Sequence, residues 1–268
     1  MGTVYLVGAG PGAPDLLTVR AARLLGEADI VFHDALIHPD TLALASRAEK
    51  ILVGKRCGRH STAQQFINKR LVDAARRYRV VVRLKGGDPM LFGRAQEEIG
   101  FLHKNSVPVE IVPGVTAALA ASAELGISLT QRLVARSVVF ATPRTAPNAE
   151  PSGWEKAVAA ADTAVLYMAA GQAEEVRDAL LAAGRSANTP VALAESVTLD
   201  PAYFSGTLAD LPVLAKNLKG GPALVLLGQV FAATLIRGQG ANSFGTMCEP
   251  NYDPDPELRA TARRRKAQ

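Results

Sequence analysis

Three closely spaced glycines follow the first apolar run of the chain. Residues 4–18 read VYLVGAGPGAPDLLT, with glycine at the alternate positions Gly8, Gly10 and Gly12. Glycine adopts backbone angles that other residues resist, and its missing side chain lets a ligand approach the backbone closely. The loop could therefore hold a phosphate or a sulfonium cofactor, or it could be only a tight turn between a strand and a helix.

A nucleotide phosphate fits this loop poorly. The dinucleotide fingerprint is G-x-G-x-x-G, but the third glycine comes one residue early at Gly12, and Ala13 occupies its expected place. Pro11 also lacks an N–H, which leaves the loop fewer donors for a pyrophosphate. The residues thus disfavour a nicotinamide cofactor and leave the sulfonium and the tight turn open.

The elements that must position this loop alternate between apolar runs and helical patterns. Nearly all-apolar runs are typical of strands in a parallel sheet that helices cover on both faces. They span residues 4–10, 28–34, 50–54, 79–89, 107–114, 137–143, 163–170, 190–196 and 222–230. Helical patterns span residues 15–28, 61–78, 93–106 and 116–126. We therefore expect an α/β protein with two lobes, residues 1–115 and 116–237, each a mostly parallel sheet flanked by helices.

Length and composition predict a soluble globular protein. With 268 residues and 48% hydrophobic side chains, the chain has ample material for a core. No apolar run approaches the roughly 20 residues that span a bilayer, and the start MGTVYLVGAG does not resemble a secretory signal. Cys57 and Cys248 are the only cysteines, and neither has the set of closely spaced Cys and His residues that a structural zinc site needs. We expect a cytoplasmic protein with no metal and no disulfide framework.

The chain is basic, with a formal net charge of +5 and a pI near 9.4. Such an excess of cations suits a nucleic acid, an anionic membrane surface or an acidic small molecule. Much of the charge lies in ELRATARRRKAQ, residues 257–268, after a stretch rich in glycine and proline. We interpret residues 238–268 as an irregular or disordered basic tail that aids solubility, and we expect neither a nucleic-acid nor a membrane partner.

Further motifs follow the glycine loop in a fixed order. They are FHDAL, GKR, RLKGGDPMLFGRAQEE, VPGVTAALA, LTQR, LYM and PVALAE, between residues 32 and 195. In this order and spacing they resemble the tetrapyrrole methylases, and within that family the enzymes that methylate uroporphyrinogen III. The resemblance covers about residues 3–230, and RLKGGDPxxFGR is its most specific part.

The resemblance implies a two-lobed enzyme, usually a homodimer, that binds S-adenosyl-L-methionine in a cleft between the lobes and releases S-adenosyl-L-homocysteine. It answers the question of the glycine loop in favour of a sulfonium. The family's cofactor positions fall on Pro11, Gly86, Gly87, Asp88, Leu91, Thr116, Ala117, Met168 and Val197.

Three of these cofactor positions have a second interpretation. Asp88 could bind ribose hydroxyls or the methionine ammonium, or it could only cap a turn. Met168 could contact ligand or pack in a core. Val197 stands where the family commonly has glycine, so its side chain could crowd the adenosine unless the contact is made by the backbone.

The substrate implied by the resemblance is a tetrapyrrole with many carboxylates, so its site should contain cations. The candidates are Lys55, Arg56, Arg94 and Arg132, with Met168 as a further contact. Each arginine could instead be a surface charge. Glu97 lies three residues after Arg94 on the same face of a predicted helix. This pair could fix the guanidinium or exchange protons with a pyrrole.

The implied reaction is attack of a pyrrole carbon on the sulfonium methyl, without a metal or a protein nucleophile. By resemblance, Asp34 is the proton acceptor and Lys55 the proton donor; their alternatives are a strand-end cap and a surface cation. Methyl transfer to two adjacent rings gives precorrin-2 via precorrin-1, a product common to sirohaem and cobalamin biosynthesis.

The chain departs from the family pattern at several positions near the expected site. Ala35 follows the motif aspartate, where arginine is common, and Ala95 and Gln96 replace two glycines. Further departures are Gln131, Thr142, Pro143 and Arg144. These changes leave three alternatives open: a later precorrin C-methyltransferase, a ribosomal-RNA methyltransferase of the same fold, or a nonenzymatic module that binds tetrapyrrole or cofactor.

Overall fold

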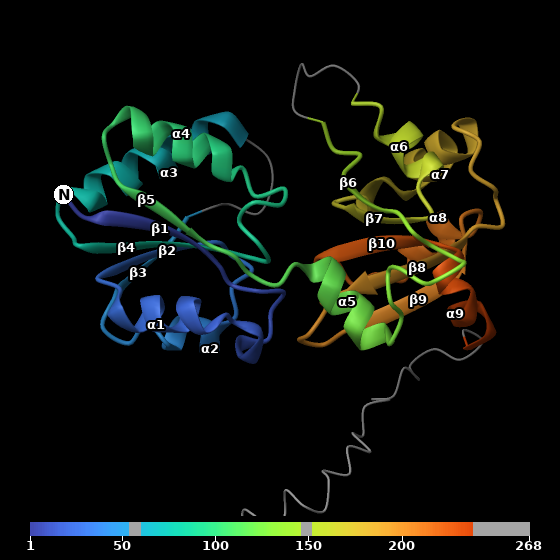
Figure 1. Cartoon of the computed structure of the whole chain (residues 1–268), viewed down its shortest axis with the longest axis horizontal. Coiled ribbons are helices and arrows are strands. Elements are labelled where there is room, and N and C mark those ends of the chain that lie inside the picture. The colour runs from blue at the N-terminus through green and yellow to red at the C-terminus, as the bar shows by residue number, and fades with distance from the viewer. Residues whose placement is uncertain (54–59, 146–151, 238–268) are drawn as a thin grey trace, which may run out of the picture.

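The computed structural model describes residues 1–53, 60–145 and 152–237 and contains two α/β lobes (Figure 1). The first lobe ends with strand β5, and residues 113–116 connect it to helix α5, which begins the second lobe. The two-lobed α/β architecture expected from the sequence is thereby confirmed. The exact domain bounds stay a prediction, and the tail at 238–268 lies outside the described residues.

The first lobe is built around a parallel sheet in the strand order β3-β2-β4-β1-β5. Two hydrophobic clusters cover its faces: α1 and α2 pack on one, and α3 and α4 on the other (Figure 1). Its elements are β1 (Thr3–Gly8), η1 (Pro14–Leu16), α1 (Val19–Glu27), β2 (Ile30–His33), α2 (Pro39–Ala43), β3 (Glu49–Leu52), α3 (His60–Ala75), β4 (Val80–Lys85), α4 (Ala95–Lys104) and β5 (Val109–Val112).

Parallel strands bring their carboxyl ends to one edge of the sheet. At this edge the glycine loop follows β1, Asp34 follows β2, and the GGD segment follows β4. β1 and β4 are neighbours at the centre of the sheet. The chain continues from β1 to β2 on one side of this pair and from β4 to β5 on the other side, which makes their carboxyl ends a topological switch point. In open α/β sheets, ligands bind in the crevice at such a point.

The second sheet has the order β6-β7-β10-β8-β9 and is mixed rather than mostly parallel as the sequence analysis predicted. Only β6 and β7 are parallel; the other neighbours are antiparallel. The elements are α5 (Ala117–Leu125), β6 (Val138–Ala141), α6 (Trp154–Ala160), β7 (Thr163–Tyr167), η2 (Ala170–Gln172), α7 (Ala173–Ala182), β8 (Pro190–Glu195), β9 (Ala202–Thr207), α8 (Leu211–Ala215), β10 (Ala223–Gly228), η3 (Gln229–Phe231) and α9 (Ala232–Arg237).

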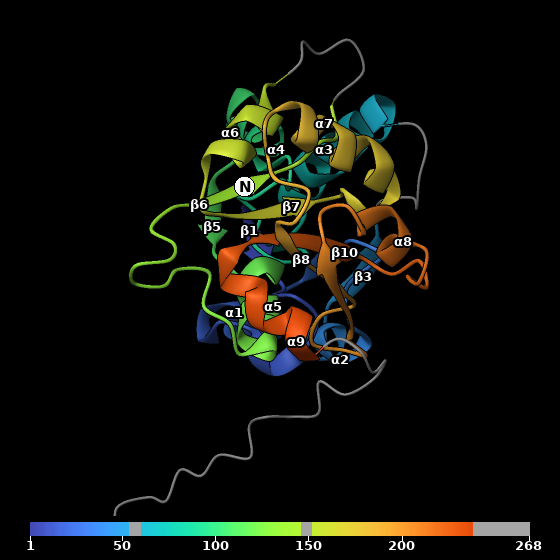
Figure 2. The ribbon, with the colours of Figure 1, turned by 90° about the vertical axis from the view of Figure 1, so that its right-hand side faces the viewer.

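The short connection between β8 and β9 explains part of this difference. Only residues 196–201 join these strands, which is too few for the crossover that a parallel pair requires. Helices still cover both faces: α5 and α9 lie on one side and α6 and α7 on the other (Figure 2). Strand β8 is therefore buried along its whole length, and its apolar run alone does not reveal strand direction.

None of the helices within the described ranges is both long and apolar enough to cross a membrane.

Candidate functional site

A cavity of about 950 Å³ lies between the two lobes. Its volume is in the range of small-molecule sites. The first lobe contributes the carboxyl ends of β1, β2 and β4, and the second contributes the start of α5 and the segments after β7 and β8. The predicted site residues that line it are Pro11, Asp34, Gly86, Gly87, Asp88, Leu91, Arg94, Thr116, Ala117, Met168 and Val197.

The glycine loop pairs with the GGD segment at this cavity. The N–H of Gly10 donates to the Gly87 carbonyl at 3.2 Å, and the N–H of Gly87 donates to the Gly10 carbonyl at 2.7 Å. Both glycines are left-handed, with φ of 74° and 66°, a conformation that glycine adopts without a steric penalty. The two loops that follow β1 and β4 therefore form one unit.

Gly8 and Gly114 serve close packing of the strands. A Cβ atom on Gly114 would lie 2.3 Å from the Gly87 carbonyl oxygen, and one on Gly8 would lie 2.6 Å from the Gly114 Cα atom. These glycines allow three strand ends to converge beneath the cavity. Part of the glycine pattern thus has a structural role in backbone packing. This agrees with the tight turn that the sequence analysis kept as an alternative to ligand binding.

Asp88 ties the GGD segment to its surroundings. Its Oδ1 accepts the N–H of Met90 at 2.8 Å, and its Oδ2 accepts the N–H of Gly114 at 2.9 Å. This is the capping role that the sequence analysis weighed against ligand binding. The side chain also lines the cavity, and contact with a cofactor stays a prediction.

Tyr167 organises the wall formed by the second lobe. Its hydroxyl lies 2.5 Å from Oγ1 of Thr116 and accepts the N–H of Ala118 at 3.2 Å. The hydroxyl thereby satisfies a backbone donor in the first turn of α5, where the Thr116 side chain does not cap the helix. Burial raises the pKa of Tyr167, so the phenol is neutral at physiological pH.

Non-glycine residues with a left-handed backbone gather around the cavity. Within the described ranges, those that line it are Phe92, Arg94, Met168 and Ser196, with φ between 52° and 56°. Such conformations cost about 1 kcal/mol or more each and concentrate at ligand sites. Met168 is 44% exposed, which favours ligand contact over the alternative of core packing.

Val197 borders the cavity but packs in the core of the second lobe. It is buried in the cluster that also contains Ala118, Ala192 and Leu224. The adjacent Thr198 accepts the N–H of Ala13 from the glycine loop at 2.8 Å through its Oγ1. The segment after β8 therefore links the second lobe directly to the glycine loop.

Arg94 and Glu97 form the pair that their spacing predicted. Arg94 donates from Nε to Oε1 and from Nη2 to Oε2 of Glu97, both at 2.7 Å. This hydrogen bonding raises the pKa of Arg94 and lowers the pKa of Glu97. Arg94 lines the cavity, whereas Glu97 supports it from the first turn of α4.

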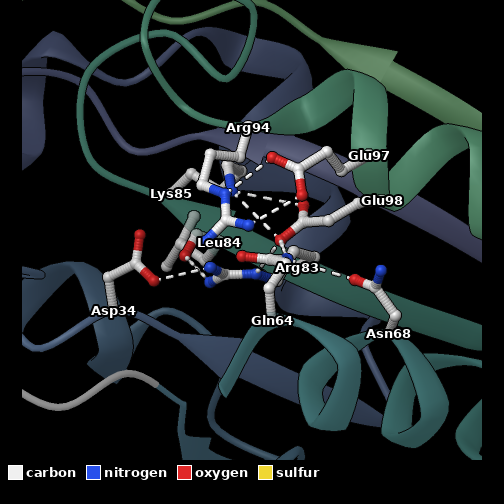
Figure 3. A network of polar contacts seen from close by, with 9 residues as sticks. All are labelled: Asp34, Gln64, Asn68, Arg83, Leu84, Lys85, Arg94, Glu97 and Glu98. Atoms are coloured by element: carbon white, nitrogen blue, oxygen red, sulfur yellow. Dashed lines mark hydrogen bonds and ion pairs between the residues drawn. The ribbon is translucent and has the colours of Figure 1, made fainter. Parts of the chain in front are cut away.

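A network of charges, most of them buried, lies at the cavity, and Asp34, Arg83 and Lys85 are among the residues that line it (Figure 3). Arg83 donates to Asp34 at 2.6 Å and to Glu98 at 3.2 Å, and Lys85 donates to both Glu98 oxygens at 3.2 Å. Burial, reinforced by the nearby Arg83 charge, lowers the pKa of Lys85, and Glu98 opposes that shift.

The sequence analysis missed Arg83, Lys85 and Glu98 as individual site residues. A signal was available, because Arg83 and Lys85 alternate with apolar residues along β4 and so share one face of the sheet. Two cations on a buried strand require anionic partners. The sequence analysis also missed Phe92 and Tyr167, whose rings pack with centroids 5.1 Å apart.

Arg132 does not line this cavity. It lies in a separate surface hollow beside Gln131 and Leu133, on a turn in which Gln131 and Ala135 exchange backbone hydrogen bonds. Lys55 and Arg56 lie outside the described residues. The roles predicted for these three cations therefore stay predictions.

The polar groups around the cavity suit an organic ligand that carries carboxylates. Arg83, Lys85 and Arg94 provide positive charge, Asp34 provides a carboxylate, and glycines expose backbone. Among the side chains that the structure describes, no group of three or more His, Cys, Asp or Glu could hold a metal ion.

Comparison with known proteins gives the family. A model of the tetrapyrrole (corrin/porphyrin) methylases matches residues 3–212, which is most of the chain. The chain belongs to the tetrapyrrole methylase family. Several of the family's motifs contribute residues to the cavity, among them the glycine loop, RLKGGDPMLFGRAQEE and VPGVTAALA.

Relatives of this tetrapyrrole methylase include a siroheme synthase of Pseudomonas fluorescens, 46% identical over 232 residues. A siroheme synthase of Pseudomonas putida is 47% identical over the same length. In each case the match covers 85% of this chain and 50% of the relative. The chain thus spans about half the length of the curated relatives it matches.

Solved structures similar to this methylase include uroporphyrin-III C-methyl transferase from Thermus thermophilus in complex with S-adenyl homocysteine. That structure is 37% identical, with a TM-score of 0.75, and the match covers 87% of this chain and 94% of that one. A cobalt precorrin-4 methyltransferase is 29% identical, also with a TM-score of 0.75, over 85% of this chain and 95% of its own.

Proposed function

We propose that this tetrapyrrole methylase is a uroporphyrinogen-III C-methyltransferase that uses S-adenosyl-L-methionine. It methylates two adjacent pyrrole rings and gives precorrin-2 via precorrin-1. The observation that carries the proposal is that the Asp34 carboxylate, the Arg94 guanidinium and the glycine-rich loops line one cavity. Greater identity to the uroporphyrin-III enzyme than to the precorrin-4 enzyme supports this substrate.

The cavity has room for the cofactor beside the GGD segment. Gly86 is exposed and lines the cavity, and a Cβ atom built on it would meet nothing within 4 Å. Thr116 and Ala117 also line the cavity, at the start of α5, where helical N–H groups lack intrahelical partners. The residues that would hold S-adenosylmethionine are those of the GGD segment, Pro11, Leu91, Thr116, Ala117, Met168 and the backbone at Val197.

Bound S-adenosylmethionine supplies an electrophilic methyl group on its sulfonium. Holding a pyrrole carbon in line with that methyl group provides much of the acceleration. Arg94 orients a substrate carboxylate, and Met168 contacts the macrocycle. Asp34 accepts the proton that the methylated ring loses, and Lys55 is the proposed proton donor.

Homodimer formation and a cytoplasmic location complete the proposal. Both come from the family resemblance. Analytical ultracentrifugation of the purified chain should give twice the monomer mass of 28.2 kDa. A monomer at the concentrations used for catalysis would contradict the homodimer.

A valine at Gly86 tests the cofactor site. A Cβ atom on Gly86 would meet nothing within 4 Å, and Gly86 lines the cavity, so the side chain of Gly86→Val should enter the proposed cofactor space. We expect calorimetric binding of S-adenosylhomocysteine to weaken at least a hundredfold while the melting temperature stays within a few degrees.

Gly171→Val is the matched control, because its Cβ also meets nothing within 4 Å and the residue lies outside the cavity. This control should bind S-adenosylhomocysteine like the wild type. Equal affinity in Gly86→Val and Gly171→Val would show that the cofactor does not lie beside Gly86.

A further inference from the structure

The Arg83 guanidinium is fixed on three sides. The residue is 3% exposed, and each of its three side-chain nitrogens donates one hydrogen bond: Nε to Glu98 at 3.2 Å, Nη1 to the Leu84 carbonyl at 3.1 Å, and Nη2 to Asp34 at 2.6 Å (Figure 3). A planar guanidinium that makes three bonds in different directions cannot turn without losing some of them. Its position is therefore set by β4 and α4.

Glu98, the carboxylate that accepts from Arg83 Nε, is itself held by buried partners. Glu98 is completely buried and, besides Arg83, accepts hydrogen bonds from Lys85 and from Gln64 at 2.9 Å. Gln64 in turn donates to Asn68 at 3.1 Å on α3. Breaking one contact of a buried charge network leaves a buried charge without compensation, which is costly. The members of the network are therefore held in fixed positions.

The network ends at the cavity. Asp34 follows β2 directly, and β2 pairs with β4 in the register Phe32 opposite Arg83. The Asp34 side chain lines the cavity and is 35% exposed, whereas that of Arg83, which also borders the cavity, is 4% exposed and that of Glu98 is fully buried. One carboxylate of a buried network is thus presented to the ligand.

We propose that Arg83 is a positioning residue that holds the Asp34 carboxylate in its reactive orientation. Within this network, Asp34 is the residue that contacts the reacting ring, and Glu98 acts indirectly by fixing Arg83. The inference rests on the proposed function, in which Asp34 takes the proton after the methyl–sulfur bond breaks and the methyl–carbon bond forms. Lysine at position 83 would keep the charge but could not make all three hydrogen bonds.

The test is a double-mutant cycle on methyl transfer to uroporphyrinogen III, measured in single turnovers under anaerobic conditions. Arg83→Lys should lower the rate at least tenfold, while the affinity for S-adenosylhomocysteine changes less than threefold. In the background of Asp34→Asn, Arg83→Lys should have little further effect, because the carboxylate it positions is absent. If the fold-loss of rate in the double variant equals the product of the two single-variant losses, Arg83 acts independently of Asp34, and the inference is overturned.

Arg185→Lys is the matched control for a lost guanidinium. Arg185 is half-buried and donates to three carbonyl groups of the second lobe, Ala159, Ala161 and Asp162, away from the cavity. Its replacement should leave the transfer rate within twofold. A loss equal to that of Arg83→Lys would point to a general effect on stability.

Two further measurements keep the inference testable if activity or folding fails. If Arg83→Lys does not fold, Glu98→Gln replaces it, since it keeps the shape of Glu98 and loosens Arg83; its losses should likewise vanish in the Asp34→Asn background. If the wild type does not methylate uroporphyrinogen III, the proposed function fails. Crystal structures of the wild type and the folded variant with S-adenosylhomocysteine then decide the inference. The Asp34 carboxylate should move in the variant, and an unmoved carboxylate would overturn the positioning role.

Discussion

Arg94 is held by Glu97 through two hydrogen bonds, and this pairing is the reason to expect a large effect from a conservative change. Lysine at position 94 retains the positive charge but loses the planar guanidinium, whose Nε and Nη2 donate together to the Glu97 carboxylate. We expect Arg94→Lys to lower turnover of uroporphyrinogen III at least tenfold, a loss of about 1.4 kcal/mol in transition-state stabilisation. Steady-state kinetics and calorimetry with S-adenosylhomocysteine check this, and the cofactor affinity should barely change.

Arg177→Lys is the control for this prediction, because Arg177 also donates to a neighbouring carboxylate, that of Asp178, but lies outside the cavity. Near-normal turnover of Arg94→Lys would make Arg94 an ordinary charge at a helix start. Loss of cofactor binding would instead mean that Arg94 belongs to the cofactor half of the cavity.

At the scale of elements, the strand ends of the first sheet position the site, and their packing can be tested. Alanine at Gly114 would place a Cβ 2.3 Å from the Gly87 carbonyl and so separate the ends of β4 and β5. We expect Gly114→Ala to lower the free energy of unfolding by about 1–3 kcal/mol, the usual cost of overpacking, and to weaken cofactor binding. Denaturant titration and calorimetry measure the two effects.

Gly26→Ala is the matched control, since a Cβ on Gly26 in α1 meets nothing within 4 Å. Alanine is favoured over glycine inside a helix, so this variant should be as stable as the wild type or more so. Equal stability of both variants would contradict the close packing of the three strand ends.

The sequence predicted the first sheet well because its central strands β1, β2 and β4 are largely buried apolar runs and its strands are separated by amphipathic helices. It did not predict the antiparallel strands of the second sheet. β8 is fully buried, so its sequence is an apolar run whether it pairs parallel or antiparallel with its neighbours. Motif residues such as Asp34 and Arg94 could be found from spacing and resemblance. Tyr167 could not, because its bond to Thr116 joins residues 51 positions apart.

At the scale of the whole molecule, β10, the last strand that the structure describes, lies inside the second sheet between β7 and β8, so both neighbours of β10 come before residue 238 in the chain. We therefore expect truncation after Arg237 to leave methyl-transfer turnover within twofold of the full chain. Parallel assays of both proteins at equal concentration measure this. A collapse of turnover with an unchanged circular dichroism spectrum would place the tail in the site or in a dimer interface.

The central claim is that the cavity between the lobes methylates uroporphyrinogen III. The most direct measurement is anaerobic incubation of the purified wild-type chain with uroporphyrinogen III and S-adenosylmethionine, followed by mass spectrometry of the tetrapyrrole over time. We predict a transient product with one added methyl group and a final product with two, both absent without the cofactor. Cofactor binding without any methylated tetrapyrrole would contradict the account.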